Sequence, residues 1–198
     1  DVTIPEIAGT IAQLVKNLRQ TGTIRGESKV YFAGLSLSGL VALELALEHA
    51  NLFDGIAIMA SAAKIGTAEA WNERSEMVLF SGTEAMVEMS AQLWVAESFH
   101  DYSKLDTQKQ ALANADDQSY AALCQALANY DASDRLGEIT LPLFTVAGDQ
   151  DQMCTVADAQ QISSAVQNGS TAVIKNAAHL LPLEAPQQLA ELLDSHLL

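Results

Sequence analysis

The 198-residue sequence is poor in positive charge and in long apolar runs, and each shortage removes a class of partner. Ten Lys and Arg residues stand against 25 Asp and Glu residues, which gives a formal net charge of -15. Such a chain lacks the basic surface that binds a phosphate backbone or an anionic lipid layer, so we expect neither nucleic acid nor membrane as a partner. No stretch approaches the roughly 18 consecutive apolar residues of a membrane-spanning helix.

Cysteine is scarce as well. The two cysteines, Cys124 and Cys154, cannot build a disulfide framework, and no Cys/His pair has the spacing of zinc ligands. We interpret both thiols as buried and reduced, and we expect no metal site. Residues 1–20 show neither the basic nor the apolar segment of a secretory signal, and the first residue is Asp1 rather than Met, so we expect the native start to lie upstream. A cytoplasmic location is our expectation for the protein.

What the sequence does contain is an alternation of helical and strand patterns around one region of different character. Thr3 to Glu6 form a capping box, and apolar residues then recur at helical spacing to about residue 19. Strands are predicted over residues 29–33 and 55–60, with a helical pattern between them. A strand, helix, strand unit implies parallel pairing of the two strands.

Residues 62–138 carry no strong strand pattern and are rich in Ala, Glu, Gln and Met. Helices are predicted there near residues 69–80, 83–98, 104–115 and 117–129. After this region, strands are predicted at residues 143–147 and 171–174, and helices over residues 155–166 and 186–198. We therefore predict an α/β core made of residues 1–61 and 139–198, with a mostly parallel sheet, and a helical cap made of residues 62–138.

The turn between the first predicted strand and its helix favours a nucleophile elbow at Ser36. The positions two before and two after the nucleophile of such a turn must be small, and Gly34 and Ser38 satisfy this. With Ser38 as nucleophile the later position would be Leu40, whose side chain would crowd the turn. The N–H of Leu37 would then donate to an oxyanion. The alternative is an ordinary Gly/Ser turn that caps a helix.

A serine needs a base and an orienting acid, which follow it in the order acid, then histidine, in this arrangement. Asp149 and Asp151 come directly after a predicted strand, and we favour Asp151 for the triad and Asp149 for a turn hydrogen bond. Among the histidines, His179 follows a core strand and enters a loop. Its alternative is a buried structural histidine, but three suitable side chains at the carboxyl ends of three strands favour a catalytic triad. The other histidines lie at a helix end, in the insertion and near the chain end (His49, His100 and His196).

Residues 34–39, 148–151 and 179–186 together resemble the α/β-hydrolase superfamily, and segments 63–74 and 119–127 are similar to the cap of 3-oxoadipate enol-lactonases. The resemblance covers the whole chain. It implies hydrolysis of the enol-lactone of the β-ketoadipate pathway of aromatic catabolism, by a serine nucleophile and without a cofactor. The family usually has Gly where this chain has Ser38 and Ala178, and both replacements are small.

An anionic lactone or ester would be the small-molecule substrate, and a cation must then offset the acidic chain. We select Arg74, three residues after Trp71 on a predicted helix, so that an aromatic face and a planar fork share one side. The alternative is a solvated arginine beside Glu73 and a tryptophan that fills the cap.

Other functions on the same scaffold remain open at this point. They are a carboxylesterase, a hydrolase of carbon–carbon bonds, and a hydrolase-like protein that binds a ligand without turning it over. The family core has more strands than the four predicted, so we expect residues 1–198 to be the C-terminal part of a longer polypeptide. The second oxyanion donor would lie upstream of residue 1, and residues 1–198 alone would be poorly soluble and nearly inactive. The oligomeric state is left open.

Overall fold

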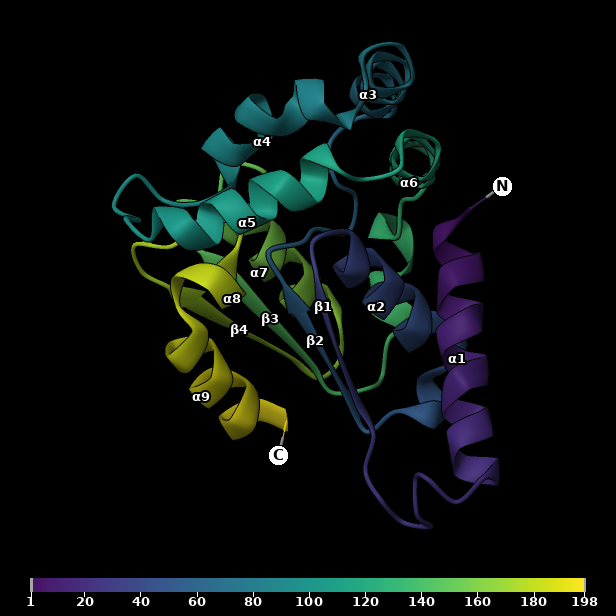
Figure 1. The fold of residues 1–198 in the computed structure, drawn as a ribbon. Coiled ribbons are helices and arrows are strands. Elements are labelled where there is room, and N and C mark those ends of the chain that lie inside the picture. Colours follow the sequence, from purple (N-terminus) through teal and green to yellow (C-terminus); the bar gives the residue numbers. More distant parts are fainter. Residues whose placement is uncertain (1, 198) are drawn as a thin grey trace.

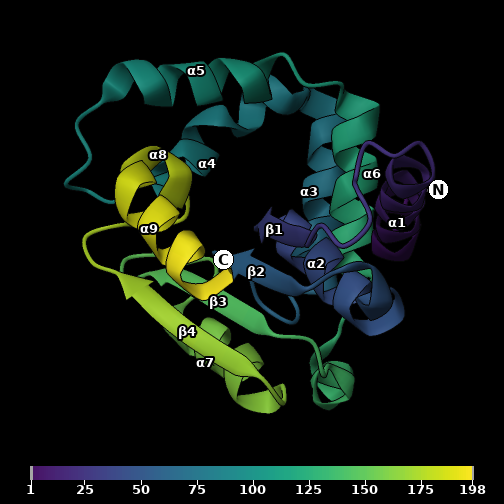
Figure 2. The ribbon, with the colours of Figure 1, turned by 90° about the horizontal axis from the view of Figure 1, so that it is seen from below.

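Four parallel strands form the centre of the structure, a computed structural model that describes residues 2–197 (Figure 1). They are β1 (Tyr31–Leu35), β2 (Gly55–Met59), β3 (Leu143–Gly148) and β4 (Gly169–Ile174). The strands pair in the order β1-β2-β3-β4, with β1 and β4 at opposite edges (Figure 2). All three pairs are parallel, so each connection crosses over through helices. The predicted α/β class and parallel sheet are confirmed.

β1 differs from the prediction in its position. The sequence places it at residues 29–33 because glycine weakens a strand, whereas the structure continues it through Gly34 to Leu35. Gly34 and Leu35 pair with Ile58 and Met59 of β2, and this pairing holds the glycine in the strand. Ser36 is therefore the first residue after the strand.

The helices that lead into and out of β1 are amphipathic and buried, respectively. α1 (Ile4–Gln20) starts at the predicted capping box, in which the Glu6 N–H donates to Thr3 Oγ1 at 3.2 Å and the Thr3 N–H donates to Glu6 Oε2 at 3.0 Å. α2 (Leu37–Glu48) is buried on all sides from Gly39 to Ala46, with Glu44 as the one charged residue of that stretch, and it is packed between α1 and the sheet. A helix buried on all sides fixes the site that lies at its first turn.

The two faces of the sheet are covered by different helices. Ile56 and Ile58 of β2 belong to the core that includes α1 and α2, whereas Ala57 and Met59 pack with the C-terminal helix α9 (Pro186–Leu197). Every residue of β2 is buried, as expected where a parallel sheet carries helices on both faces.

Four helices lie between β2 and β3 in the chain, together above one end of the sheet (Figure 1). They are α3 (Ala68–Ser81), α4 (Val87–Trp94), α5 (Tyr102–Ala113) and α6 (Asp117–Ala128). Their packing is tightest between α3 and α6, where the Ser75 hydroxyl donates to the Ala121 carbonyl at 3.2 Å. The predicted helix at residues 83–98 is a short turn (Thr83–Met86) followed by α4, which ends at Trp94.

The remaining elements complete the core. α7 (Val156–Ala165) begins at a second capping box, made by Thr155 and Asp158. The four-residue helix α8 (Leu181–Glu184) is not predicted from sequence, and short 3-10 turns cover Ala50–Leu52 and Ser133–Glu138. The predicted end of the last helix, Leu198, lies outside the described residues. Within residues 2–197 no helix is both long and apolar enough to cross a bilayer, and no group of three or more His, Cys, Asp or Glu is arranged to hold a metal.

Candidate active site

Ser36 occupies a strained position between β1 and α2. Its φ of 55° and ψ of -120° lie in a region that side chains other than glycine seldom adopt. Three hydrogen bonds hold this conformation: the Ser36 N–H donates to the Met59 carbonyl at 2.9 Å, and the Ser36 carbonyl accepts from the Gly39 N–H at 2.7 Å and from Ser61 Oγ at 2.8 Å. The strain is thus maintained by groups on α2 and just after β2.

The small residues around Ser36 are required by the sharpness of this turn. A Cβ atom on Gly34 would lie 2.5 Å from the Ser38 carbonyl carbon and closer still to its oxygen. Gly34 therefore packs directly against the backbone of the first turn of α2. Leu37 is the first residue of that helix, where the backbone N–H has no carbonyl acceptor one turn earlier in the helix.

Asp151 and His179 form a buried pair at the ends of β3 and β4. Asp151 Oδ2 lies 2.8 Å from His179 Nδ1, and the two residues are 6% and 4% exposed. Asp151 Oδ1 accepts from the N–H groups of Met153 at 2.8 Å and Cys154 at 3.0 Å, which fixes the carboxylate. Nδ1 of the imidazole is thus the ring nitrogen engaged by the carboxylate, which leaves Nε2 as the ring nitrogen that can exchange a proton with another group.

Asp149 has a different environment from Asp151. It accepts a hydrogen bond from the Asn176 N–H at 2.7 Å and lies 3.4 Å from the ammonium group of Lys175. These contacts join the turn after β3 to the turn after β4. The structure therefore places Asp151, and not Asp149, beside the histidine.

One pocket of about 260 Å³ is lined by all the residues selected from the sequence except Asp151, which lies behind His179. Ser36, Leu37 and His179 line it from the core, and Trp71 and Arg74 line it from α3. Its other walls are Trp94, Leu112, Tyr120, Leu123, Cys124, Leu127 and Met153. The pocket is thus formed between the carboxyl ends of the strands and the helices above them.

Arg74 is half-buried and points into the helical insertion, which is the predicted cap of residues 62–138, rather than toward Glu73. Its Nε donates to the Tyr120 hydroxyl at 3.0 Å and an Nη donates to Ser90 Oγ at 2.6 Å. The guanidinium carbon lies 5.8 Å from the centroid of the Trp71 ring and 5.7 Å from that of Tyr120. No carboxylate among residues 2–197 forms an ion pair with Arg74. The hydrogen-bond acceptors of the Arg74 guanidinium are therefore neutral hydroxyl groups.

Trp71 is fixed by its own hydrogen bond, which its indole N–H donates to the Ile65 carbonyl. Gly66 has a φ of 64° and lies against the indole ring, so the turn before α3 also positions this side chain.

Both cysteines are free and buried, as expected from the sequence. Burial raises the pKa of Cys124, which keeps this pocket thiol protonated at neutral pH.

Several pocket residues are absent from the sequence prediction. On α6, Tyr120, Leu123, Cys124 and Leu127 all face the pocket, and their spacing of three, four and seven residues is a signal that a helical face gives. On α4, the pocket residue Trp94 and the Arg74 partner Ser90 have no comparable signal, because only the packing of the helices of the insertion brings them near Arg74.

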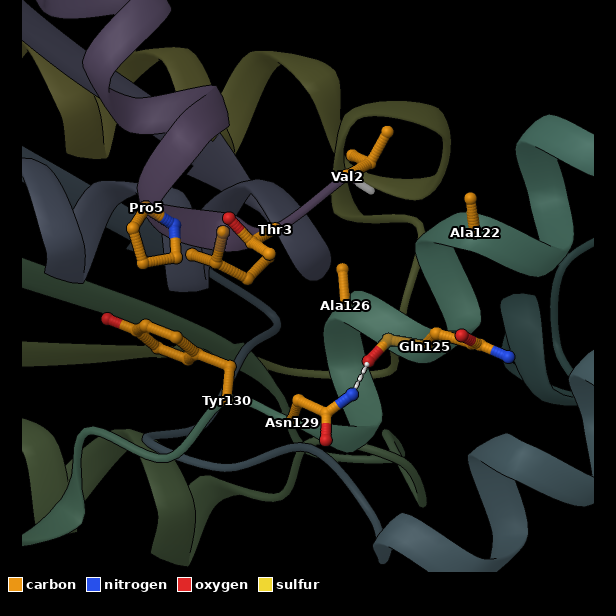
Figure 3. Close-up of a pocket in the computed structure, with 9 residues that line it drawn as sticks. Val2, Thr3, Pro5, Ala122, Gln125, Ala126, Asn129 and Tyr130 are labelled. Atoms are coloured by element: carbon orange, nitrogen blue, oxygen red, sulfur yellow. Dashed lines mark hydrogen bonds between the residues drawn. The ribbon is translucent and has the colours of Figure 1, made fainter.

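A larger cavity, about 410 Å³, lies away from this site, between the start of α1 and α6 (Figure 3). Val2 and Pro5 face Ala126 across it, and two of its polar side chains are already hydrogen-bonded. The Asn129 amide donates to the Gln125 carbonyl at 2.8 Å, and the Tyr130 hydroxyl donates to buried Glu44 at 3.0 Å. The cavity holds no paired nucleophile and base, so its size alone does not make it the functional site.

The chain is similar to known hydrolases. It matches the alpha/beta hydrolase family over residues 2–192. It is 34% identical over 166 residues to 3-oxoadipate enol-lactonase 1 of Acinetobacter baylyi, an alignment that covers 83% of this chain and 62% of that relative. The chain thus spans less than two thirds of the length of that relative.

Two solved structures share the fold at lower identity. The enol-lactonase from Burkholderia xenovorans LB400 superposes with a TM-score of 0.88 at 23% identity, covering 99% of this chain and 73% of that one. A thermophilic esterase from Thermogutta terrifontis gives a TM-score of 0.88 at 21% identity, with coverage of 98% and 71%. Together with the sheet order, the turn at Ser36 and the family match, these likenesses establish that the chain belongs to the α/β hydrolase family.

Proposed function

We propose that the protein hydrolyses a small anionic lactone, with the enol-lactone of 3-oxoadipate as the substrate. The observation that carries the proposal is one pocket lined by Ser36, by His179, which is paired with buried Asp151, and by Arg74, which has no carboxylate partner among residues 2–197. The similarity to an enol-lactonase at 34% identity supports the choice of lactone.

In the first half-reaction Ser36 Oγ attacks the lactone carbonyl carbon. His179 Nε2 takes the hydroxyl proton, and Asp151 stabilises the imidazolium that forms. The Leu37 N–H donates to the oxyanion of the tetrahedral intermediate. When the ring C–O bond breaks, His179 returns the proton to the leaving enol oxygen. The product of this step is an acyl-enzyme whose released enol converts to the ketone.

In the second half-reaction water attacks the acyl carbonyl. His179 takes one proton of the water, and the tetrahedral intermediate breaks the bond to Ser36 Oγ, which regains the proton. The net reaction adds one water molecule to the lactone and releases a dicarboxylate. No redox partner is needed.

Arg74 is the group proposed to hold the carboxylate that the substrate already carries. Its guanidinium is fixed by Tyr120 and Ser90 and stacked near Trp71, so it is ordered before the substrate arrives. A preorganised guanidinium can bind a carboxylate through two parallel hydrogen bonds. The apolar walls contributed by α6 would enclose the carbon skeleton.

The test is hydrolysis of the enol-lactone by the full-length protein and by its Ser36→Ala variant. We expect Ser36→Ala to lower kcat by roughly three orders of magnitude or more, because members of a triad act as a unit. Ser38→Ala, which removes a neighbouring hydroxyl on α2, is the matched control and should keep most of the activity. A serine-directed phosphonate probe should label Ser36. Substantial turnover by Ser36→Ala, or labelling at Ser38, would refute the assignment.

A carboxylesterase is the second candidate, favoured by the apolar walls of the pocket, which suit an uncharged aryl ester. Relative kcat/KM values on the enol-lactone and on an aryl acetate separate the two functions. A preference for the aryl ester would favour the esterase. Ligand binding without labelling of Ser36 would instead favour a protein that binds and does not hydrolyse.

A further inference from the structure

Glu184, at the end of α8, accepts two backbone hydrogen bonds from distant parts of the chain. Its Oε1 accepts from the Ala178 N–H at 2.7 Å, and its Oε2 accepts from the Ala96 N–H at 2.7 Å. Ala178 precedes the histidine, whereas Ala96 follows α4 in the helical insertion. Burial raises the pKa of Glu184, while the two N–H groups act in the opposite direction. A half-buried carboxylate with both oxygens engaged in this way joins two segments rather than facing solvent.

The residues on both sides of His179 each donate a backbone hydrogen bond that ties the histidine turn down. The N–H before the histidine, that of Ala178, donates to Glu184. The N–H after it, that of Leu180, donates to the carbonyl of Trp94 at 2.8 Å. Trp94 also lines the active-site pocket with its side chain. The segment from Trp94 to Ala96 and the turn that carries His179 are thus joined by three hydrogen bonds, two of them through Glu184.

The same turn is held from the opposite side by the end of β3. The Gln150 N–H donates to the Ala177 carbonyl at 2.9 Å, and a Cβ atom on Gly148 would lie only 2.7 Å from the Ala177 carbonyl carbon. The histidine turn is therefore packed between β3 and the insertion. A shift of its backbone on the Glu184 side would change the 2.8 Å distance between His179 and Asp151.

We propose that Glu184 is a positioning residue that couples the placement of the helical insertion to the alignment of His179. This inference rests on the proposed hydrolase function. Glu184 is not among the residues that line the pocket, so it acts through the backbone of Ala178 and not on the substrate. The Glu184 carboxylate would thus help to fix both the pocket wall at Trp94 and the position of the base, His179.

The chemistry of the side chain explains why a carboxylate is needed. Both partners are N–H donors, and an ionised carboxylate offers an acceptor to each. The amide of a glutamine offers one acceptor, and its NH₂ group would face the second N–H. Glu184→Gln thus keeps the size of the side chain but breaks one of the two hydrogen bonds.

The experiment compares Glu184→Gln with Glu184→Asp and with Glu191→Gln, an exposed glutamate on α9 that serves as the matched control. We expect Glu184→Gln to lower kcat about 10- to 100-fold with KM within about twofold, because misplacing a catalytic group by about 1 Å can cost 100-fold. Glu184→Asp retains two acceptors and should recover part of kcat. Glu191→Gln should match the unsubstituted protein. Equal kcat values for Glu184→Gln and Glu191→Gln would overturn the proposal, as would a loss explained by the unfolded fraction alone.

A second measurement does not depend on turnover. The proton between His179 and Asp151 should give a low-field ¹H resonance, which we expect to weaken or shift in folded Glu184→Gln and to persist in Glu191→Gln. An unchanged resonance in Glu184→Gln would refute the positioning role even if the protein hydrolyses no lactone. Absence of hydrolysis and of Ser36 labelling in the unsubstituted protein would instead refute the proposed function.

Discussion

Replacing Gly34 by alanine tests whether the sharp turn at Ser36 is what makes the serine available. The added Cβ would lie 2.5 Å from the Ser38 carbonyl carbon and 2.9 Å from the Gly39 nitrogen. Both atoms are backbone, so no side chain can rotate away. Ordinary contacts begin at 3.4 Å and the Ser38 carbonyl oxygen would lie closer still, which means that β1 and the start of α2 must separate by at least about 1 Å.

The expected effect on activity follows from that displacement. A shift of about 1 Å in the nucleophile relative to the base and the oxyanion donor can cost about 100-fold in rate. Overpacking of a tight contact also lowers the free energy of unfolding, by roughly 1 to 3 kcal/mol. The fall in kcat should therefore be larger than the loss of folded protein explains.

The assay measures kcat on the lactone together with unfolding in urea. Gly9→Ala is the matched control, because Gly9 lies within α1 and a Cβ atom there meets nothing within 4 Å. It should leave kcat unchanged and raise the unfolding free energy by about 0.4 to 1 kcal/mol. If Gly34→Ala turned over at the same rate as Gly9→Ala, the steric account of the elbow would be wrong.

Two further substitutions examine the charged groups. Arg74→Ala should lower kcat/KM on the anionic lactone, with a loss of transition-state stabilisation of about 1.5 to 3 kcal/mol, and should affect a neutral aryl ester much less. Lys64→Ala is the control. Equal losses on both substrates would indicate that the substitution disturbs the folding of the insertion. Tyr130→Phe removes the hydroxyl that donates to Glu44 at 3.0 Å in the buried core. Denaturant titration should therefore show that the free energy of unfolding falls by about 1 to 3 kcal/mol. Tyr102→Phe, at an exposed position, should show no such fall. An unchanged midpoint for Tyr130→Phe would mean that water replaces the hydroxyl.

The parts of the site that are predictable from sequence are those fixed by local chain geometry. Gly34 must be small because it packs against the backbone of Ser38 across the turn at Ser36, and this requirement can be recognised from the five residues 34–38. Asp151 and His179 follow β3 and β4, which are neighbouring parallel strands, and parallel strands bring their carboxyl ends to one edge of the sheet. The order of the elements therefore predicts that these side chains meet, without any knowledge of the packing.

The surroundings of Arg74 depend on tertiary packing and are not predictable in this way. Ser90, Tyr120 and Arg74 come from three helices, whose relative placement follows from the fit of many apolar side chains. Sequence spacing relates Trp71 to Arg74 but says nothing of the other two. The same holds for the short helix that carries Glu184, since a turn of four residues has no periodicity to detect.

The arrangement around Arg74 also shows how an acidic protein could bind the anionic substrate that we propose. A net charge of -15 repels an anion at long range, but salt screens exposed charges beyond about 8 Å at physiological ionic strength. Within the pocket, the half-buried guanidinium acts at contact distance, where screening is weak. Because no carboxylate of residues 2–197 pairs with it, its charge is not already neutralised. Binding of a carboxylate would therefore be decided by Arg74 and its neutral partners rather than by the charge of the whole chain.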